Sequence, residues 1–234
     1  MGIEVCADPA VAWNNEYMRQ GIPSSRREEP SRVLRWALAN LPFLTDNAIR
    51  SAVDLGCGTG RNAMALVEAG ADRVDGLDFS ATALKIARAR ETPGGVTFIE
   101  GNMTKPLPFE DNSFDFAVDI FAYFHQLTDI DRINYRREIH RILKPGAILL
   151  ISIATDMDGY YSSCGPGPLR DIESSVRLTW DPVAEVGNIL LSPGELAMEF
   201  ADTCTLQMSW VKRKQGIMHG RPYMRETAAT LWMK

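Results

Sequence analysis

The 234-residue chain has few cysteines, no long apolar run and no excess of basic residues. Its four cysteines, Cys6, Cys57, Cys164 and Cys204, are far apart and form no C-x-x-C pair, which argues against a disulfide scaffold or a zinc site. No apolar stretch approaches the roughly 20 residues that a membrane-spanning helix needs. The N-terminus lacks the basic start and apolar core of a secretory signal. We therefore expect a cytoplasmic protein with no membrane partner.

Acidic residues outnumber basic ones, 30 against 25, for a formal net charge of -5. Proteins whose main partner is a nucleic acid usually present a basic face, so this balance argues against such a partner. Hydrophobic residues make up 45% of the chain, as in a globular protein with a true core. The length suits one large domain, and the sequence leaves open a monomer or a homodimer.

Residues 53–66, with the sequence VDLGCGTGRNAMAL, organise the rest of the chain. Val53 and Leu55 are typical of a buried strand, and the run from Asn62 to Leu66 is compatible with a helix. Glycines stand at every second position between them and can adopt backbone angles that other residues avoid. Such a turn lets a ligand approach bare backbone N–H groups at the start of a helix.

The glycine spacing and two acids indicate which ligand this is. Dinucleotide sites carry G-x-G-x-x-G, whereas Gly56, Gly58 and Gly60 give the tighter G-x-G-x-G. Asp54 would repel a pyrophosphate, which argues against a nicotinamide oxidoreductase and favours a ligand with a cationic group. Asp78 ends the next apolar segment, at the position that binds a ribose in open α/β folds. A ribose joined to a cationic amino-acid group describes S-adenosylmethionine.

This stretch resembles the first motif of class I S-adenosylmethionine-dependent methyltransferases, in which a hydrophobic-acid-hydrophobic-G-x-G-x-G segment is followed by an acid at the next strand end. Two further segments, PFEDNSFD at 108–115 and RILKPGAIL at 141–149, are also similar to sequences of that superfamily. The resemblance implies that Asp54 and the glycines hold the amino-acid end of the cofactor. It places the ribose on Asp78 and the adenine on Asn102 and Met103. The expected cofactor residues are Tyr17, Asp54, Gly56, Cys57, Gly58, Gly60, Asn62, Asp78, Phe79, Asn102, Met103, Asp119 and Phe121, the last two nearest the methyl group.

Strand and helix patterns alternate between residues 53 and 153, which implies a parallel sheet with right-handed crossovers. Expected strands cover 53–55, 74–78, 96–99, 114–120 and 147–153. With the C-terminal pair described next, the chain predicts a Rossmann-like doubly wound α/β sheet of seven strands. Most strands would be parallel, one C-terminal strand antiparallel, and helices would cover both faces. We divide this single domain into an N-terminal cap (1–45), a cofactor-binding core (46–153), and a lid and hairpin (154–234).

The C-terminal third lacks a further strand–helix unit. Residues 154–191 are rich in loop signals and aromatic side chains, and we expect them to form a lid inserted after strand five. Ser192, Pro193 and Glu195 predict a helix start with a capping box. Segments 206–211 and 227–232 predict two antiparallel strands around a polar loop, 212–222.

Within the superfamily, the best resemblance is to tellurite-resistance-type methyltransferases and their small-molecule relatives. It rests on Gly60-Arg61-Asn62, the ATDMD exit from strand five at 154–158, the PGEL helix start at 193–196 and AATLW at 228–232. Those relatives bind anions with His and Arg side chains of the last hairpin. Here that hairpin carries His219, Arg221 and Arg225.

Three residues are candidates for the chemistry. Methyl transfer is an in-line displacement in which alignment contributes most, and a base is needed only if the nucleophile must lose a proton. His125 follows the fourth strand near the expected methyl position, where it can act as a base, orient the substrate or merely cap the next helix. His219 is expected over the pocket mouth, and Tyr123 can stack on a substrate, although both can equally be structural. We expect no metal.

These observations predict S-adenosylmethionine-dependent methyl transfer to a small-molecule nucleophile (O, N, S or metalloid), with S-adenosylhomocysteine as product. A tRNA or protein methyltransferase is one alternative, which the acidic balance disfavours. A protein of the same fold that binds the cofactor without methylating is another, and it would release no S-adenosylhomocysteine.

Overall fold

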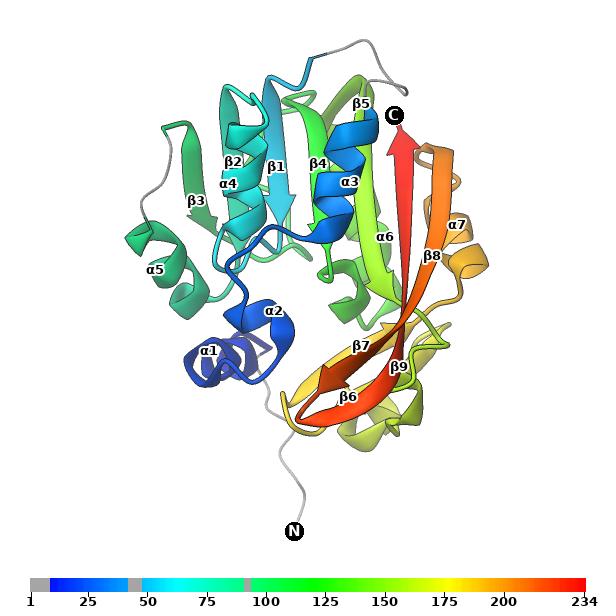
Figure 1. The fold of residues 1–234 in the computed structure, drawn as a ribbon. Helices are drawn as coiled ribbons and strands as arrows, with labels where there is room; N and C mark the ends of the chain where they lie inside the picture. The colour runs from blue at the N-terminus through cyan, green and yellow to red at the C-terminus, as the bar shows by residue number, and fades with distance from the viewer. Residues whose placement is uncertain (1–8, 42–47, 91–93) are drawn as a thin grey trace.

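The computed structural model describes residues 9–41, 48–90 and 94–234, so Cys6 lies outside the described residues. Seven strands form one sheet in the order β3-β2-β1-β4-β5-β9-β8 (Figure 1). β9 is antiparallel to both of its neighbours, and the pairs from β3 to β5 are parallel. This confirms the predicted sheet. The strands are β1 (Ser51–Leu55), β2 (Arg73–Asp78), β3 (Val96–Glu100), β4 (Phe114–Ile120), β5 (Leu143–Ala154), β8 (Thr205–Met218) and β9 (Arg221–Met233).

Helices cover both faces of this sheet, as Figure 1 shows. Successive side chains of a strand point to opposite faces, so each strand contributes to two cores. Ala52 of β1 packs with α3 and α4, whereas its neighbour Val53 packs with α6 and α7. None of the helices within the described ranges is long and apolar enough to cross a membrane. The helices are α1 (Pro9–Arg19), α2 (Pro23–Arg26), α3 (Arg32–Asn40), α4 (Arg61–Glu68), α5 (Ala81–Ala89), α6 (Asp129–Ile142) and α7 (Pro193–Phe200).

Several helix starts follow from local side-chain chemistry. The hydroxyl groups of Ser31 and Ser80 accept hydrogen bonds from the first turns of α3 and α5. At α7, Ser192 and Glu195 form the predicted capping box, in which each side chain bonds the backbone of the other residue.

The lid is more regular than its sequence indicates. It holds the 3-10 helices η3 (Tyr161–Ser163) and η4 (Gly167–Asp171) and a two-stranded antiparallel sheet of β6 (Arg177–Asp181) and β7 (Val186–Leu190). Figure 1 shows this sheet beyond the carboxyl ends of the central strands, on the same side as α1 and α2. The strands were missed because each is only five residues long and interrupted by polar residues.

The predicted polar loop 212–222 is wrong, because most of it is strand. β8 continues to Met218 and β9 begins at Arg221, so the hairpin turns at His219 and Gly220 alone. Both turn residues have positive φ, +48° and +76°, as a tight two-residue hairpin requires. The charged residues that suggested a loop pair across the strands instead: Arg213 lies 2.6 Å from the carboxylate of Glu226.

Candidate active site

The glycine turn between β1 and α4 is held in place by the neighbouring strand. The N–H of Gly56 donates to the carbonyl oxygen of Leu77 at 2.8 Å. Gly58 has a φ of +54°, and its N–H donates to Oδ2 of Asp78 at 2.8 Å. A β-carbon at Gly58 would collide with the hydroxyl oxygen of Tyr17, so only glycine fits this position. Asp78 therefore fixes the shape of the turn.

Two buried carboxyl groups lie at this turn with perturbed acidity. Asp54 is 1% exposed, and its Oδ2 has no hydrogen-bond partner within the described parts of the chain. Burial raises the pKa of Asp54 to about 7, although the nearby Arg61 opposes this shift. Burial likewise raises the pKa of Asp78 to about 6, against the hydrogen bonds that its carboxylate accepts. A cation bound beside either group would favour its ionised form.

A cavity of about 410 Å³ lies at the carboxyl ends of the central strands, between the turn, α1 and the lid. Open α/β sheets place their ligands at this edge. The structure brings together here many of the residues expected from the sequence: Tyr17, Gly56, Asp78, Phe79, Asn102, Met103, Phe121 and His125.

Helix α1 forms one wall of the cavity and is fastened to the core. Oδ1 of Asn14 accepts hydrogen bonds from the Ser80 hydroxyl group at 2.8 Å and from the backbone N–H of Thr82 at 3.0 Å. The hydroxyl group of Tyr17 rests against Gly58. Trp13 and Tyr17 of α1 line the cavity, so this helix lies over the glycine turn and the cavity.

His125 ends the 3-10 helix η2 (Tyr123–His125), which follows β4, and lines the cavity. Its Nδ1 lies 2.9 Å from the carbonyl oxygen of Gly187. A carbonyl oxygen only accepts hydrogen bonds, so Nδ1 carries the ring proton and Nε2 is left as an acceptor. Burial lowers the pKa of His125 to about 4, so the ring is neutral near pH 7. The indole of Trp13 packs edge-on against it, with ring centroids 4.9 Å apart.

Other expected cofactor residues do not line this cavity: Asp54, Cys57, Gly58, Gly60, Asn62 and Asp119. Asn62 is used structurally, because its Oδ1 accepts a hydrogen bond from the N–H of Ser31 at 2.9 Å. Gly60 has a φ of +77° at the start of α4, where a β-carbon would lie 2.5 Å from the ring of Phe98. The buried side chain of Cys57 packs beneath the turn.

Asp119 lies behind the cavity, which corrects its expected place near the methyl group. Its Oδ1 accepts hydrogen bonds from the N–H groups of Ala122 and Tyr123, both at 3.0 Å, and its Oδ2 accepts from the hydroxyl group of Tyr135. Burial raises its pKa to about 6. Asp119 therefore holds the chain turn that presents Phe121, with its positive φ of +65°, to the cavity.

Tyr123 and His219 also lie away from the cavity lining. The buried hydroxyl group of Tyr123 donates to Oε2 of Glu199 at 2.6 Å. His219 is in the β8–β9 turn rather than over the pocket mouth, with Nε2 3.0 Å from Oδ2 of Asp181. Both side chains therefore hold parts of the fold together through these contacts.

The hairpin arginines do not form the anion site implied by the narrower resemblance. Nε of Arg225 donates to the buried carboxylate of Asp158 at 2.7 Å, and Arg221 is exposed. Neither of them lines the cavity. The hairpin ties the lid to the sheet instead.

Sequence reasoning did not single out the residues that complete the cavity on the lid side. They come from the segment between η2 and α6, from the first turn of α6, from η4 and the residue after it, and from the β6–β7 hairpin: Gln126, Leu127, Asp131, Leu169, Ile172, Trp180, Glu185, Val186 and Gly187. Only Gln126 carried a usable signal, because it directly follows His125 in the chain.

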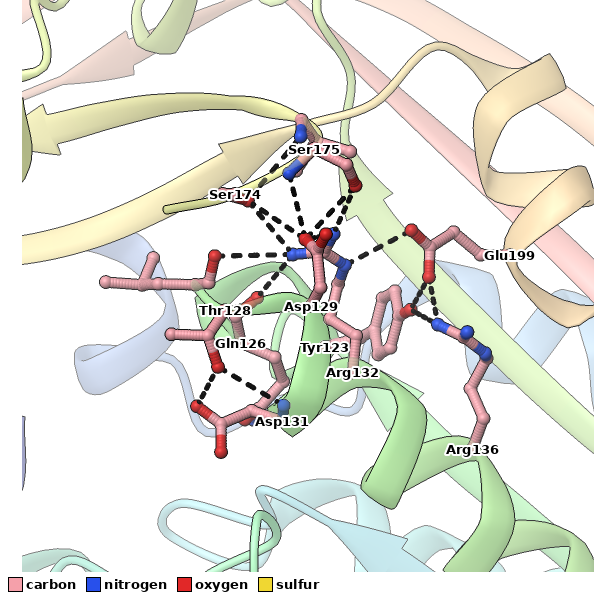
Figure 2. A network of polar contacts seen from close by, with 12 residues as sticks. Tyr123, Gln126, Thr128, Asp129, Asp131, Arg132, Arg136, Ser174, Ser175 and Glu199 are labelled. Atoms are coloured by element: carbon pink, nitrogen blue, oxygen red, sulfur yellow. Dashed lines mark hydrogen bonds and ion pairs between the residues drawn. The ribbon is translucent and has the colours of Figure 1, made fainter. Parts of the chain in front are cut away.

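Arg132 of α6 joins this segment to the lid and to α7 (Figure 2). The residue is 1% exposed, and its guanidinium donates to Oε1 of Glu199 at 3.1 Å and to Oδ1 of Asp129 at 2.5 Å. It also donates to the hydroxyl groups of Ser174 and Ser175, at 3.3 and 3.1 Å. One buried cation thus connects three segments beside the cavity.

Comparisons with known proteins agree with this architecture. Residues 52–146 match the model of a methyltransferase domain family. A demethylmenaquinone methyltransferase of Geobacillus stearothermophilus is 36% identical over 123 residues, which cover 50% of each chain. A trans-aconitate 2-methyltransferase of Rhizobium leguminosarum bv. trifolii is 33% identical over 150 residues, covering 63% of this chain and 52% of the relative. The chain spans about half the length of the curated relatives it matches.

A solved structure extends the likeness across most of the fold. A SAM-dependent methyltransferase from Methanosarcina mazei superposes with a TM-score of 0.66 at 22% identity, covering 83% of this chain and 96% of that protein. The chain therefore has the Rossmann-like fold of class I methyltransferases, and its matched core is similar in sequence to a methyltransferase domain.

Proposed function

We propose that this protein transfers the methyl group of S-adenosylmethionine to a small-molecule nucleophile. The observation that carries the proposal is Asp54, a buried carboxyl group with an unpartnered oxygen behind the glycine turn, of which Gly56 lines the cavity; its charge would act on a ligand through this turn and not by direct contact. Such a group has no use beside a pyrophosphate, but it suits a ligand that brings a positive charge. The ammonium and sulfonium groups of S-adenosylmethionine supply that charge.

The residues present fit this cofactor. Asp78 faces the cavity at the end of β2, where it would bind the ribose hydroxyl groups. Asn102, Met103 and Phe79 would hold the adenine; the Asn102 side chain uses Oδ1 to accept hydrogen bonds from Thr104. Its amide NH₂ remains for a ligand, and the thioether of Met103 suits a flat ring.

When bound, S-adenosylmethionine supplies an electrophilic methyl group on a positively charged sulfur. The chain would contribute alignment, because the glycine turn, α1 and the lid confine both reactants to one cavity, and positioning is the largest part of such catalysis. His125 would accept the proton of an O–H or N–H nucleophile at Nε2. Its Nδ1–H bond to Gly187 keeps the ring in the tautomer that this role requires.

The size of the cavity favours a small acceptor over tRNA or protein. A volume of about 410 Å³ falls at the low end of small-molecule sites, and it must hold part of the cofactor as well. The relatives named for trans-aconitate and demethylmenaquinone also act on small molecules, which supports this choice.

Calorimetric titration with S-adenosylmethionine, followed by an acceptor panel of phenols, amines and thiols, tests the proposal. We expect cofactor binding, and S-adenosylhomocysteine formation with at least one acceptor. Asp54→Asn should weaken cofactor binding. Asp72→Asn should not, because Asp72 is an exposed acid outside the cavity lining. Failure to bind the cofactor would refute the proposal. Binding without product for any acceptor would favour a non-methylating protein.

A further inference from the structure

No lysine or arginine lines the cavity among the residues that the structure describes. Its charged lining residues are Asp78 on the cofactor side and Asp131 and Glu185 on the lid side, and none is Lys or Arg. Within the described residues Asp131 has no ion-pair partner; its Oδ2 accepts a hydrogen bond from the Thr128 hydroxyl group at 2.6 Å. Glu185 lies 3.8 Å from Arg19, but both side chains are half exposed, so this pairing is weak. The negative charges on the lid side of the cavity therefore disfavour the binding of an anion.

Gln126 is a polar group without a partner on the same wall. The residue is only 5% exposed and lines the cavity beside His125. Its backbone groups are bonded, but its side-chain amide makes no hydrogen bond to any part of the chain that the structure describes. Neither polar atom of this amide is fully enclosed by the described residues, so the amide is open to the cavity. A ligand in the cavity can therefore bond it without displacing a protein partner.

The backbone of this wall is fixed by Arg132. The guanidinium donates to the carbonyl oxygens of Gln126 and Leu127, at 3.4 and 3.3 Å, while its other contacts reach the lid and α7 (Figure 2). Gln126 therefore lies on a backbone segment that Arg132 holds in place, and its side-chain amide lines the cavity. The remaining lid-side lining is apolar or aromatic and includes Trp13, Trp180, Leu169 and Ile172.

We propose that the methyl acceptor is a flat, largely apolar molecule without negative charge, held by Gln126 through a polar group and by His125 through the attacking O–H or N–H. This inference rests on the proposed function and names its substrate class. In the reaction the nucleophile forms a bond to the methyl carbon while the carbon–sulfur bond breaks toward sulfur. The nucleophile's proton passes to Nε2 of His125. A polycarboxylate, as in the name of the Rhizobium relative, would not suit this cavity.

A charge series of one ring system tests the acceptor class. Protein loaded with S-adenosylhomocysteine would be titrated calorimetrically, near neutral pH, with 4-ethylphenol (uncharged), tyramine (cationic) and 4-hydroxyphenylacetate (anionic). We expect the uncharged and cationic probes to bind at least about tenfold more tightly than the anion, because the lid side of the cavity offers two carboxylates and its described lining includes no Lys or Arg. Equal or preferred binding of the anion would overturn the inference, and so would failure of both other probes to bind at millimolar concentration.

The role of Gln126 is tested by Gln126→Leu, with Gln207→Leu as the matched control, since Gln207 is exposed on β8. Gln126→Leu should weaken 4-hydroxyacetophenone, whose carbonyl group can accept a hydrogen bond from the amide, about tenfold but leave 4-ethylphenol, which lacks that carbonyl group, unchanged. Unchanged affinity for S-adenosylhomocysteine shows that the variant is folded. Equal loss for both probes, or no loss for either, would refute the assignment. Failure of wild-type protein to bind S-adenosylhomocysteine would instead refute the proposed function.

Discussion

Among single residues, Asp54 lowers the stability of the fold when it is ionised, at a position where a ligand is expected. Its pKa of about 7 in the folded protein lies far above the value of about 3.8 in an unfolded chain. Its contribution to stability is therefore fully present below about pH 4 and is lost as the pH rises through 7. Asp54→Asn should raise the free energy of unfolding near pH 8, by at most about 4 kcal/mol, and much less near pH 5. Urea denaturation at both pH values measures this, and a destabilised variant near pH 8 would contradict it.

The same carboxyl group should make cofactor affinity depend on pH. The ammonium group of S-adenosylmethionine favours ionised Asp54, so binding should strengthen as the pH rises from about 5 to 8. Asp54→Asn should bind at least about tenfold more weakly near pH 8 and lose most of this dependence. Calorimetry across the pH range provides the measurement. An unchanged slope in the variant would assign the titration to another group, such as Asp78.

His125 should act as a neutral base, and the loss of activity at low pH should occur at a lower pH than for an ordinary histidine. With a pKa of about 4 instead of 6.5, it stays unprotonated through the range in which an ordinary histidine titrates. At saturating cofactor and acceptor, His125→Gln should lower kcat by about 10²–10⁴-fold while cofactor affinity stays unchanged. His140→Gln, an exposed histidine on α6, should leave kcat unaltered. A wild-type kcat that falls with a midpoint near pH 6.5, and loses this midpoint in His125→Gln, would contradict the assignment.

The sequence predicted the position of some candidate residues relative to the cavity better than that of others, for a physical reason. Asp78 and His125 line the cavity because Asp78 ends β2 and His125 comes shortly after β4, and the parallel sheet fixes where both strands end. Asp119 also ends a strand, but its side chain bonds the following backbone instead of facing the cavity. Which way a carboxylate turns depends on nearby donors, here Ala122, Tyr123 and Tyr135, that no local pattern reveals.

Among the elements, α6 depends on one buried charge. Removing Arg132 would leave Glu199 and Asp129 without one partner each and would detach Ser174 and Ser175 of the lid. Arg132→Met should lower the free energy of unfolding by about 3–5 kcal/mol, the usual effect of breaking a buried ion pair.

Arg137→Met provides the control for this prediction, because Arg137 is an exposed arginine of the same helix. It should change stability by less than about 0.5 kcal/mol. Chemical denaturation of both variants and of the wild-type protein measures the three free energies of unfolding. Equal stabilities would mean that the network around Arg132 contributes little to the fold.

The elements themselves were predictable where their signals were local. β4 was predicted from the turn-rich segment before it and its family resemblance, and the start of α7 from its cap residues. β6 and β7 were missed, because their pairing is between short segments and is decided by packing against the rest of the lid. The Lys212–Arg213–Lys214 run was mistaken for a loop, since an exposed edge strand carries the polar residues typical of one.

In the whole molecule, the cavity is assembled from three parts of the chain that are far apart in sequence. The ends of the strands and the loops that follow them supply one side, α1 covers it, and the lid supplies the opposite side. The first part is shared with the matched methyltransferase domain, which ends at residue 146. The match does not cover α1 or the lid, whereas Gln126 and Asp131, which also line the cavity, lie within it.

The fastening of α1 has a consequence for the rate of turnover. Asn14 bonds the start of α5 and Tyr17 rests on Gly58, so a bound cofactor would have to leave past this helix. The lid opposite is tied to the sheet by the pair of Arg225 and Asp158. We expect α1 to be the wall that opens, so that its opening, and not the displacement itself, limits how quickly spent cofactor is exchanged. Asn14→Ala should accordingly shorten the residence time of S-adenosylhomocysteine in stopped-flow displacement, and an unchanged release rate would place the exit elsewhere.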